Sequence, residues 1–115
     1  MKIYRIQDKR GRGPFEPGMA DKWLNRARAE SERPNCFEDF GDGIIFQMRA
    51  GFVSGCGFPS LEKLRFWFDT GERARLKALG YFIVQLDAEV IVAESKTQLL
   101  FWRRVPLNVG AVIIE

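Results

Sequence analysis

Apolar and polar residues alternate over the first residues of the chain, and apolar runs return in its last third. Ile3, Tyr4 and Ile6 predict a first strand. Four later runs are rich in the β-branched and aromatic residues that favour strands, at residues 81–86, 90–93, 98–102 and 111–114. Polar residues, proline or glycine separate these runs. The chain is therefore expected to end in a group of short strands.

The apolar spacing changes to three and four residues in part of the middle of the chain, which indicates a helix. This pattern predicts an amphipathic helix over 20–31, and it ends before Pro34 because proline disfavours helical backbone at the residue before it. Segment 36–42 is expected to be a loop or a short helical turn, and 44–46 to begin a strand or a helix. Three glycines within 51–59 argue against regular structure throughout that segment.

Two further helices have N-terminal signals. Ser60 is placed to cap a helix whose apolar residues recur at three- and four-residue spacing, namely Leu61, Leu64, Trp67 and Phe68. Thr70 is placed to cap another helix that runs through Leu79, and Gly80 follows where a left-handed residue commonly ends a helix. Glu72 and the other charged residues of these helices are expected on a solvated surface, whereas at least two of the neighbouring aromatic rings are expected in the core.

The order of these elements predicts the fold class. One early strand, a helical middle and a strand-rich end predict an α+β fold with a mostly antiparallel sheet and two to three helices. The 115 residues are about the size of one domain, so residues 1–115 are expected to form a single small domain. Apolar residues make up 46% of the chain and aromatic residues 13%, enough for an aromatic-rich core.

Several classes of protein are disfavoured by what the sequence lacks. No apolar run approaches the roughly 20 residues of a membrane span, and the first residues lack the apolar core of a signal peptide. We therefore expect a soluble, cytoplasmic protein. Without histidine, Cys36 and Cys56 cannot complete the four ligands of a zinc site, so no metal is expected. Both cysteines are expected to be reduced, and Ser-His and Cys-His nucleophiles are excluded.

The positive charge of the chain is local. The net charge is +3, but five basic residues against one acidic residue give the first twelve residues a net charge of +4, which leaves −1 for the remainder. Arg12 and Gly13 lie in the glycine-rich string 11–15, and Arg10 directly precedes it. Backbone amides and guanidinium groups there could hold a phosphate. The alternative is a tight turn with solvated charges. The string lacks the Gly-Lys-Ser/Thr ending of a Walker loop. It also does not match the dinucleotide fingerprint, because Glu16 stands where a third glycine is needed.

A second polar string precedes one of the late strands. Glu94 and Gln98 lie within it, with the hydroxyl groups of Ser95 and Thr97 between them. A carboxylate or carboxamide at this place could hold a ribose hydroxyl and steer a leaving group. The alternative is an ordinary turn with a solvated glutamate. The sequence leaves both interpretations open.

Five segments together resemble a family of small bacterial prophage and phage proteins, a resemblance that implies no activity by itself; they are 3–7, 11–15, 55–57, 60–68 and 93–98. More remotely, the layout resembles the ADP-ribosyltransferase-like fold. In that fold an Arg or His of the first strand contacts NAD, a segment with a Ser or an aromatic residue precedes a helix, and a late Glu or Gln orients the nicotinamide ribose.

The remote resemblance implies roles for particular residues. Arg5 would be the first-strand contact with NAD, Ser60 a middle contact, and Gln98 or Glu94 the late polar residue that serves catalysis. Arg10, Arg12 and Gly13 would complete the cofactor site. The implied function is that of a phage or prophage protein which modulates its host on an ADP-ribosyltransferase-like scaffold and binds NAD or a related nucleotide.

Two other functions stay open at this point. A phage protein of this size could be a non-enzymatic, anti-CRISPR-like inhibitor that binds a host protein or a nucleic-acid-binding complex through its basic N-terminal surface. It could also be a structural component whose partner is another copy of itself. The sequence leaves open whether the protein is an enzyme and what its oligomeric state is.

Overall fold

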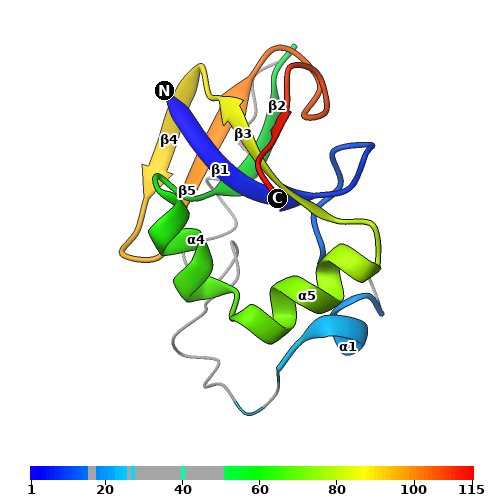
Figure 1. Ribbon diagram of the computed structural model, residues 1–115. Coiled ribbons are helices and arrows are strands. Elements are labelled where there is room, and N and C mark those ends of the chain that lie inside the picture. Colours follow the sequence, from blue (N-terminus) through cyan, green and yellow to red (C-terminus); the bar gives the residue numbers. More distant parts are fainter. Residues whose placement is uncertain (16–17, 26, 28–39, 41–50) are drawn as a thin grey trace.

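A computed structural model describes residues 1–15, 18–25, 27, 40 and 51–115 of the chain. They form two antiparallel sheets of three strands each (Figure 1). The first sheet has the order β1-β3-β6, with β1 Lys2–Gln7, β3 Phe82–Asp87 and β6 Val112–Ile113. The second sheet has the order β2-β5-β4, with β2 Val53–Gly57, β5 Leu99–Arg103 and β4 Val90–Glu94. The predicted α+β class with mostly antiparallel strands is confirmed.

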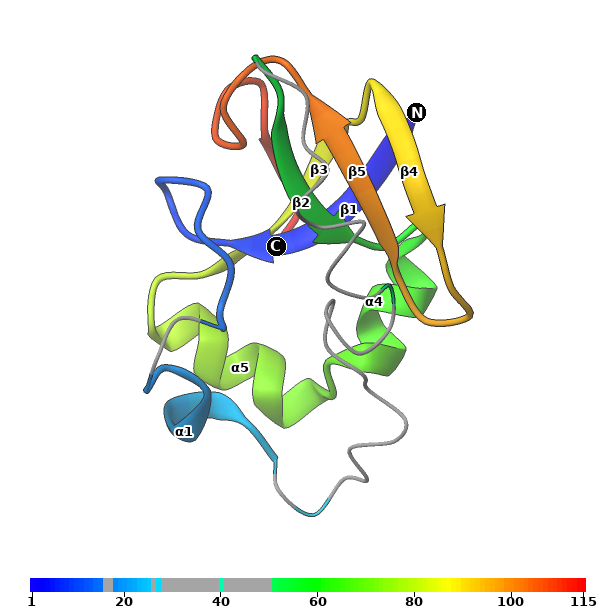
Figure 2. The ribbon, with the colours of Figure 1, turned by 180° about the vertical axis from the view of Figure 1, so that it is seen from behind.

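The helices lie together on one side of the sheets, as the front and back views show (Figure 1, Figure 2). They are α1 Ala20–Trp23, α4 Leu61–Trp67 and α5 Thr70–Ala78. No helix of the described residues is long and apolar enough to cross a membrane.

The two sheets meet where β1 passes the end of β2. Tyr4 and Phe58 form an isolated antiparallel bridge. The Tyr4 amide donates to the Phe58 carbonyl at 2.8 Å, and the Phe58 amide donates to the Tyr4 carbonyl at 2.7 Å. This pair of hydrogen bonds joins the edge strands of the two sheets, so β1 belongs to one sheet and touches the other.

Alternation along β1 divides its side chains between two cores, because successive residues of a strand point to opposite faces. Ile6 packs with the aromatic side chains of the helices, and the half-buried Tyr4 packs against the same cluster. Ile3 packs between the two sheets with Val84, Leu86, Ala88, Leu99 and Phe101. Arg5 has the parity of Ile3, so it extends from the face of β1 that is turned toward the second sheet.

The helix-side core is built mainly of aromatic rings, the largest of which are Trp23, Phe58, Trp67 and Phe68. The centroids of Trp67 and Phe68 are 4.8 Å apart, and those of Trp23 and Phe68 are 5.4 Å apart. Trp67 and Phe68 are buried, as their helical spacing predicted, whereas Phe66 remains 64% exposed. Ring packing thus fixes α4 and α1 beneath the first sheet.

The two helix starts agree only in part with the sequence interpretation. Ser60 caps α4, because its hydroxyl accepts a hydrogen bond from the Lys63 amide at 3.2 Å. The cap of α5 is Asp69 and not Thr70. Asp69 accepts from the Glu72 amide at 2.7 Å while Glu72 accepts from the Asp69 amide at 3.0 Å, and a carboxylate at the cap position competes better for the amide than a hydroxyl one residue later.

The expectation of a solvated Glu72 was wrong. Its side chain is fully buried. Besides the capping box, its carboxylate accepts a hydrogen bond from the backbone amide of Asn25 at 2.8 Å. Glu72 therefore ties the residues that follow α1 to the start of α5, a contact between distant segments that helical periodicity cannot reveal.

Other predicted elements differ in their bounds. The predicted late strands are all present, and Gly80 follows α5 with a φ of +91°. The helix predicted over 20–31 forms only as α1, and 28–31 lie outside the described residues, as do 36–39 and 41–50. Regular structure does not run throughout 51–59, but the strand β2 forms in the middle of that segment. Its glycines are needed where β1 passes close by: a Cβ at Gly57 would lie 2.9 Å from the Tyr4 carbonyl oxygen.

The expectation of two reduced cysteines was also wrong for Cys56, which is disulfide-bonded in the structure. Cys36 lies outside the described residues. Disulfide pairing depends on how closely two Cα atoms approach in the fold, and separation along the sequence does not give that distance.

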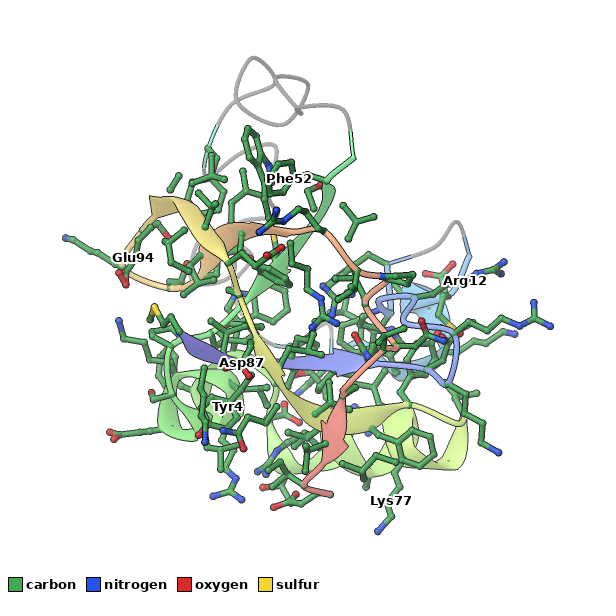
Figure 3. All side chains as sticks on the ribbon, turned by 90° about the horizontal axis from the view of Figure 1, so that it is seen from above. Tyr4, Arg12, Phe52, Lys77, Asp87 and Glu94 are labelled. Atoms are coloured by element: carbon green, nitrogen blue, oxygen red, sulfur yellow. The ribbon has the colours of Figure 1, made fainter. Side chains whose placement is uncertain are left out.

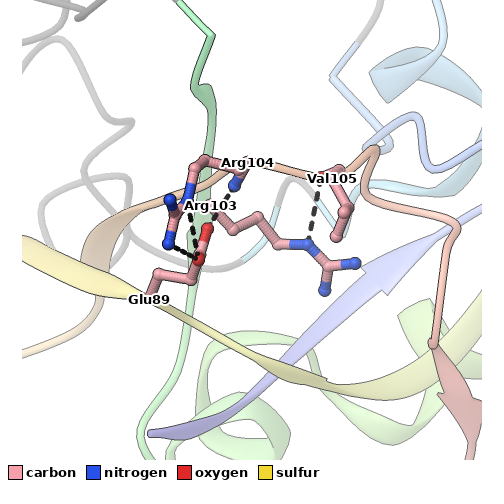
Figure 4. A network of polar contacts seen from close by, with 4 residues as sticks. All are labelled: Glu89, Arg103, Arg104 and Val105. Atoms are coloured by element: carbon pink, nitrogen blue, oxygen red, sulfur yellow. Dashed lines mark hydrogen bonds and ion pairs between the residues drawn. The ribbon is translucent and has the colours of Figure 1, made fainter.

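Arg103 stabilises the turn that follows β5 through hydrogen bonds to its backbone. Its guanidinium donates to the carbonyl oxygen of Val105 at 3.1 Å (Figure 4). It also donates to the carbonyl oxygens of Pro106, at 3.0 Å, and Val109. The neighbouring Arg104 is exposed and hydrogen-bonds the carboxylate of Glu89, which lowers the pKa of that carboxyl. The two adjacent arginines therefore differ: Arg103 is buried and holds backbone carbonyls, whereas Arg104 is exposed and pairs with Glu89.

We expect Arg103→Lys to lower the free energy of unfolding by about 1 to 3 kcal/mol, because one ammonium cannot replace a fork of donors to several carbonyl groups. Urea unfolding followed by circular dichroism measures the change. Arg104→Lys is the matched control, and we expect it to change stability little because its ion pair is solvated. Equal effects of the two substitutions would contradict the role assigned to Arg103.

Candidate functional site

A cleft of about 530 Å³ opens beside the point where the two sheets meet. Its polar side is formed by residues of β1, of β2 and of the turn before β5, with Arg5, Ser54, Cys56 and Gln98 among them. Its apolar side is formed by Pro14, Phe15, Phe58 and Trp67. Arg5 and Gln98, 93 residues apart in the sequence, thus line the same cleft. The volume lies within the usual range of small-molecule sites, roughly 300 to 1,000 Å³.

Arg5 spans the base of this cleft. Only 7% of the side chain is exposed. One terminal nitrogen, Nη1, donates to the carbonyl of Cys56 on β2 at 3.0 Å, and Nη2 donates to the carbonyl of Gly11 at 3.2 Å. The third nitrogen, Nε, is buried without a hydrogen-bond partner among the described residues. Part of the donor capacity of a fully desolvated guanidinium is therefore unused.

The charge of Arg5 is also uncompensated at short range. Burial lowers the pKa of Arg5 from 12.5 to about 10, and the negative charge of Asp8 opposes that shift more weakly. The group stays protonated at neutral pH. Within the described part of the chain its guanidinium forms no ion pair with a carboxylate. A buried cation that lacks a counter-ion is costly, and it is a ready partner for an anion that enters the cleft.

Gln98 is positioned by the turn between β4 and β5. The hydroxyl of Ser95 accepts hydrogen bonds from the amides of Thr97 and Gln98, each at 3.2 Å, and donates to the Gln98 carbonyl at 3.2 Å. The Ser95 amide donates to the same carbonyl at 2.9 Å. These bonds fix the backbone of Gln98, whose side chain is 5% exposed. The two hydroxyl groups of the string thus serve the turn.

The apolar wall is a rigid group of rings. Phe15 makes edge contacts with Trp23 at 5.3 Å and Trp67 at 5.5 Å between ring centroids. The indole nitrogen of Trp23 donates to the carbonyl of Pro14 at 3.0 Å, which fixes the residue that precedes the phenyl ring. The sequence analysis included Phe15 only as part of a turn-rich string. A proline followed by an aromatic residue in a glycine-rich loop was the available signal.

The predicted basic residues Arg10 and Arg12 lie outside the cleft. They are exposed and line a separate hollow of about 300 Å³ together with Asp8 and Lys9. One carboxylate oxygen of Asp8 accepts from both the Arg10 and the Arg12 amides at 2.9 Å. Their backbones therefore follow a turn organised by Asp8. Gly13, by contrast, does line the cleft beside Arg5.

Two other predicted residues are also placed elsewhere. Ser60 lies at the start of α4 and does not line the cleft. Glu94 is exposed at the end of β4, and Figure 3 shows it on the opposite side of the molecule from Arg12. Of the residues named from the sequence, the structure therefore brings together Arg5, Gly13 and Gln98.

A further hollow of about 460 Å³ lies between α5 and the first sheet. Its basic residues are Arg73 and Lys77, and Arg73 already donates to the hydroxyl of Thr70 at 3.2 Å. Nε of Arg73, like that of Arg5, is buried without a hydrogen-bond partner among the described residues. As whole side chains, however, Arg73 is half-buried and Lys77 exposed, so both are more open to solvent than Arg5. The cleft at Arg5 is therefore the stronger candidate for a ligand site.

Fold and cleft together define a small α+β protein with two three-stranded sheets and a buried arginine in an aromatic-walled cleft. The sequence profile of a phage family, described as the bacteriophage T4 Y00F protein, matches residues 1–112. The chain belongs to this family and is a phage-type protein. No curated protein and no solved structure matches the chain.

Gly55 makes room for Arg5, and this can be tested. A Cβ added at Gly55 would lie 2.6 Å from Nη1 of Arg5 and 3.0 Å from Cζ of Phe101. We expect Gly55→Ala to displace the guanidinium and to lower the free energy of unfolding by about 1 to 3 kcal/mol. Urea unfolding and the Arg5 Nε–H resonance in a nitrogen-15 spectrum measure the two effects.

Gly13→Ala is the matched control for that substitution. A Cβ there would lie 3.5 Å from Nη2 of Arg5, which is an ordinary contact. Neither Gly13 nor Gly55 is among the glycines with positive φ, so backbone strain does not distinguish them. An unchanged Arg5 resonance in Gly55→Ala would show that the guanidinium does not depend on this gap.

Proposed function

We propose that this phage-type protein modulates its host by binding NAD or a related nucleotide in the cleft, on an ADP-ribosyltransferase-like scaffold. The observation that carries the proposal is the pairing of a buried, uncompensated Arg5 with Gln98 along one cleft. These are the residues to which the remote resemblance assigns the first-strand contact and the late polar contact.

The chemistry of the lining suits a nucleotide. A guanidinium donates to two phosphate oxygens through adjacent N–H groups, and Nε of Arg5 has no acceptor among the described residues. Gln98 lines the same cleft, and a carboxamide carries both a donor and an acceptor, the groups that pair with ribose hydroxyls. Aromatic side chains on the opposite side supply the apolar area that most ligand sites use for affinity. The proposal concerns binding and names no reaction.

Calorimetric titration with NAD tests this function. We expect the wild-type protein to release or absorb heat on binding, and Arg5→Met to weaken binding roughly tenfold to a hundredfold, as for a lost charge-assisted hydrogen bond. Arg5→Lys should weaken binding as well, because an ammonium lacks the planar fork. Circular dichroism shows whether each variant is folded.

Arg104→Met is the control, since it removes one positive charge from an exposed residue outside the cleft. Its affinity for NAD should equal that of the wild type. If neither binding heat nor a thermal shift is seen at millimolar NAD, adenosine monophosphate or nicotinamide mononucleotide, the nucleotide hypothesis is wrong.

A second candidate function is a non-enzymatic, anti-CRISPR-like inhibitor that binds a host protein or a nucleic-acid-binding complex. The observation in its favour is the group of exposed basic residues Lys9, Arg10 and Arg12 around one shallow hollow. Exposed clusters of one sign steer an oppositely charged partner. Asp8 fixes the backbone beneath them, so the cluster is presented by a defined turn.

Affinity capture from a bacterial lysate tests the basic surface. We expect the double variant Arg10→Glu with Arg12→Glu to lose a captured partner that the wild type retains at low salt, and binding by the wild type to weaken as salt rises. Full retention of the partner by the charge-reversed protein would count against this surface. Arg65→Glu, at an exposed position on α4, serves as a charge control.

A further inference from the structure

We propose that Phe15 makes the cleft selective for a ligand with one planar aromatic ring and one anionic group. A mononucleotide has this composition, whereas a dinucleotide such as NAD has two rings and two phosphates. This inference rests on the proposed nucleotide function and specifies the ligand of the same cleft. Three observations carry it. The Phe15 ring is exposed although its loop is fixed, Arg5 is the one charged side chain of the described lining, and both residues line the same cleft.

Phe15 is unusual among the rings of the helix-side core. It is 53% exposed, whereas its partner Trp67 is 4% exposed. The centroids of Phe15 and Trp67 are 5.5 Å apart with planes at 86°, and about half of the Phe15 side chain still remains open to solvent. A large apolar surface left open to water beside a cavity is typical of a ligand contact.

The exposed ring is held in place from several directions. The carbonyl of Pro14, the residue before it, accepts the Trp23 indole hydrogen bond at 3.0 Å. The start of the same loop is held by Nη2 of Arg5, which donates to the Gly11 carbonyl at 3.2 Å. A fixed aromatic ring loses little conformational freedom when a ligand stacks on it, so it contributes more to affinity than a mobile one.

The charge of the cleft limits the anion. Among the described lining residues Arg5 is the one charged side chain, and Gln98 is the other buried polar group of large size. One guanidinium matches one phosphate or carboxylate bidentately. The basic residues Arg10 and Arg12, which could have met a second phosphate, line a different hollow. The described part of the lining thus provides one cation, which suits one anionic group.

The Phe15 ring and the Arg5 guanidinium are linked, because Arg5 hydrogen-bonds the loop that carries Phe15. A ligand whose anion meets Arg5 is therefore presented with an aromatic surface across the same cleft. Ribose 5-phosphate can use the cation alone, whereas adenosine monophosphate and nicotinamide mononucleotide can use both. The comparison of these ligands separates the two contributions, and the two mononucleotides distinguish an adenine from a nicotinamide head group.

The experiment measures dissociation constants of NAD, both mononucleotides and ribose 5-phosphate by calorimetry and tryptophan fluorescence. For the wild type we expect at least one mononucleotide to bind about tenfold or more tighter than ribose 5-phosphate. We expect Phe15→Leu to weaken that mononucleotide about fivefold to a hundredfold, the range for loss of a base stacked on an aromatic ring. Ribose 5-phosphate should change less than about twofold.

Two further variants keep the test decisive. Phe15→Tyr retains the ring and should retain the preference for the aromatic ligand. Phe66→Leu changes a phenylalanine that is 64% exposed on α4 and does not line the cleft, and it should change no affinity. Equal weakening of all four ligands by Phe15→Leu, or no weakening of any, would overturn the role of Phe15.

The outcome also separates this inference from the proposed function. If NAD binds through Arg5 more than about tenfold tighter than either mononucleotide, selection for one anionic group is wrong and the nucleotide function stands. If the wild type binds NAD and the mononucleotides but Phe15→Leu leaves every affinity unchanged, only the role of Phe15 fails. If no nucleotide binds to the wild type, both proposals fail.

Discussion

The backbone bridge between Tyr4 and Phe58 is the constraint on which the rest of the structure depends. Its two hydrogen bonds bring the edge of one sheet against the edge of the other at a single point. On one side of β1 the aromatic rings of the helices can then pack, and on the other side the residues of β5 can pack against Ile3. The cleft opens beside this junction, where neither core fills the space.

Arg5 lies at that junction, where it holds two segments together and also lines the cleft. Its terminal nitrogens hold β2 and the loop after β1 through two carbonyl groups. Neutral carbonyls satisfy hydrogen bonds but do not compensate a buried charge, and the lowered pKa reflects that deficit. An aliphatic side chain would avoid the desolvation cost. The proposal of an anionic ligand rests on this buried cation, which has no carboxylate partner among the described residues and lies beside a cavity.

Much of the fold could be predicted from the sequence, because β-branched runs and capped helical patterns act locally. The strands of the last third and the helix after Ser60 follow from these patterns. The strand β2 could not, since its glycines are explained only by the approach of Tyr4 and Arg5 from a segment about fifty residues away. Glu72 is a similar case, because a charged residue in a helical pattern gives no sign that Asn25 will meet it.

The candidate site shows the same division between local and distant information. Alternation along β1 places Arg5 and Gln7 on the same face as the buried Ile3, where polar side chains are uncommon. A polar residue at such a position can be recognised from the sequence. Gln7 donates to the Leu107 carbonyl at 2.9 Å and secures the turn before β6, and Arg5 donates to the carbonyls of Cys56 and Gly11. Each side chain also keeps one buried polar atom, Oε1 of Gln7 and Nε of Arg5, without a hydrogen-bond partner among the described residues. Only the folded chain shows which distant carbonyl groups these polar side chains contact and that Arg5 lines a cleft.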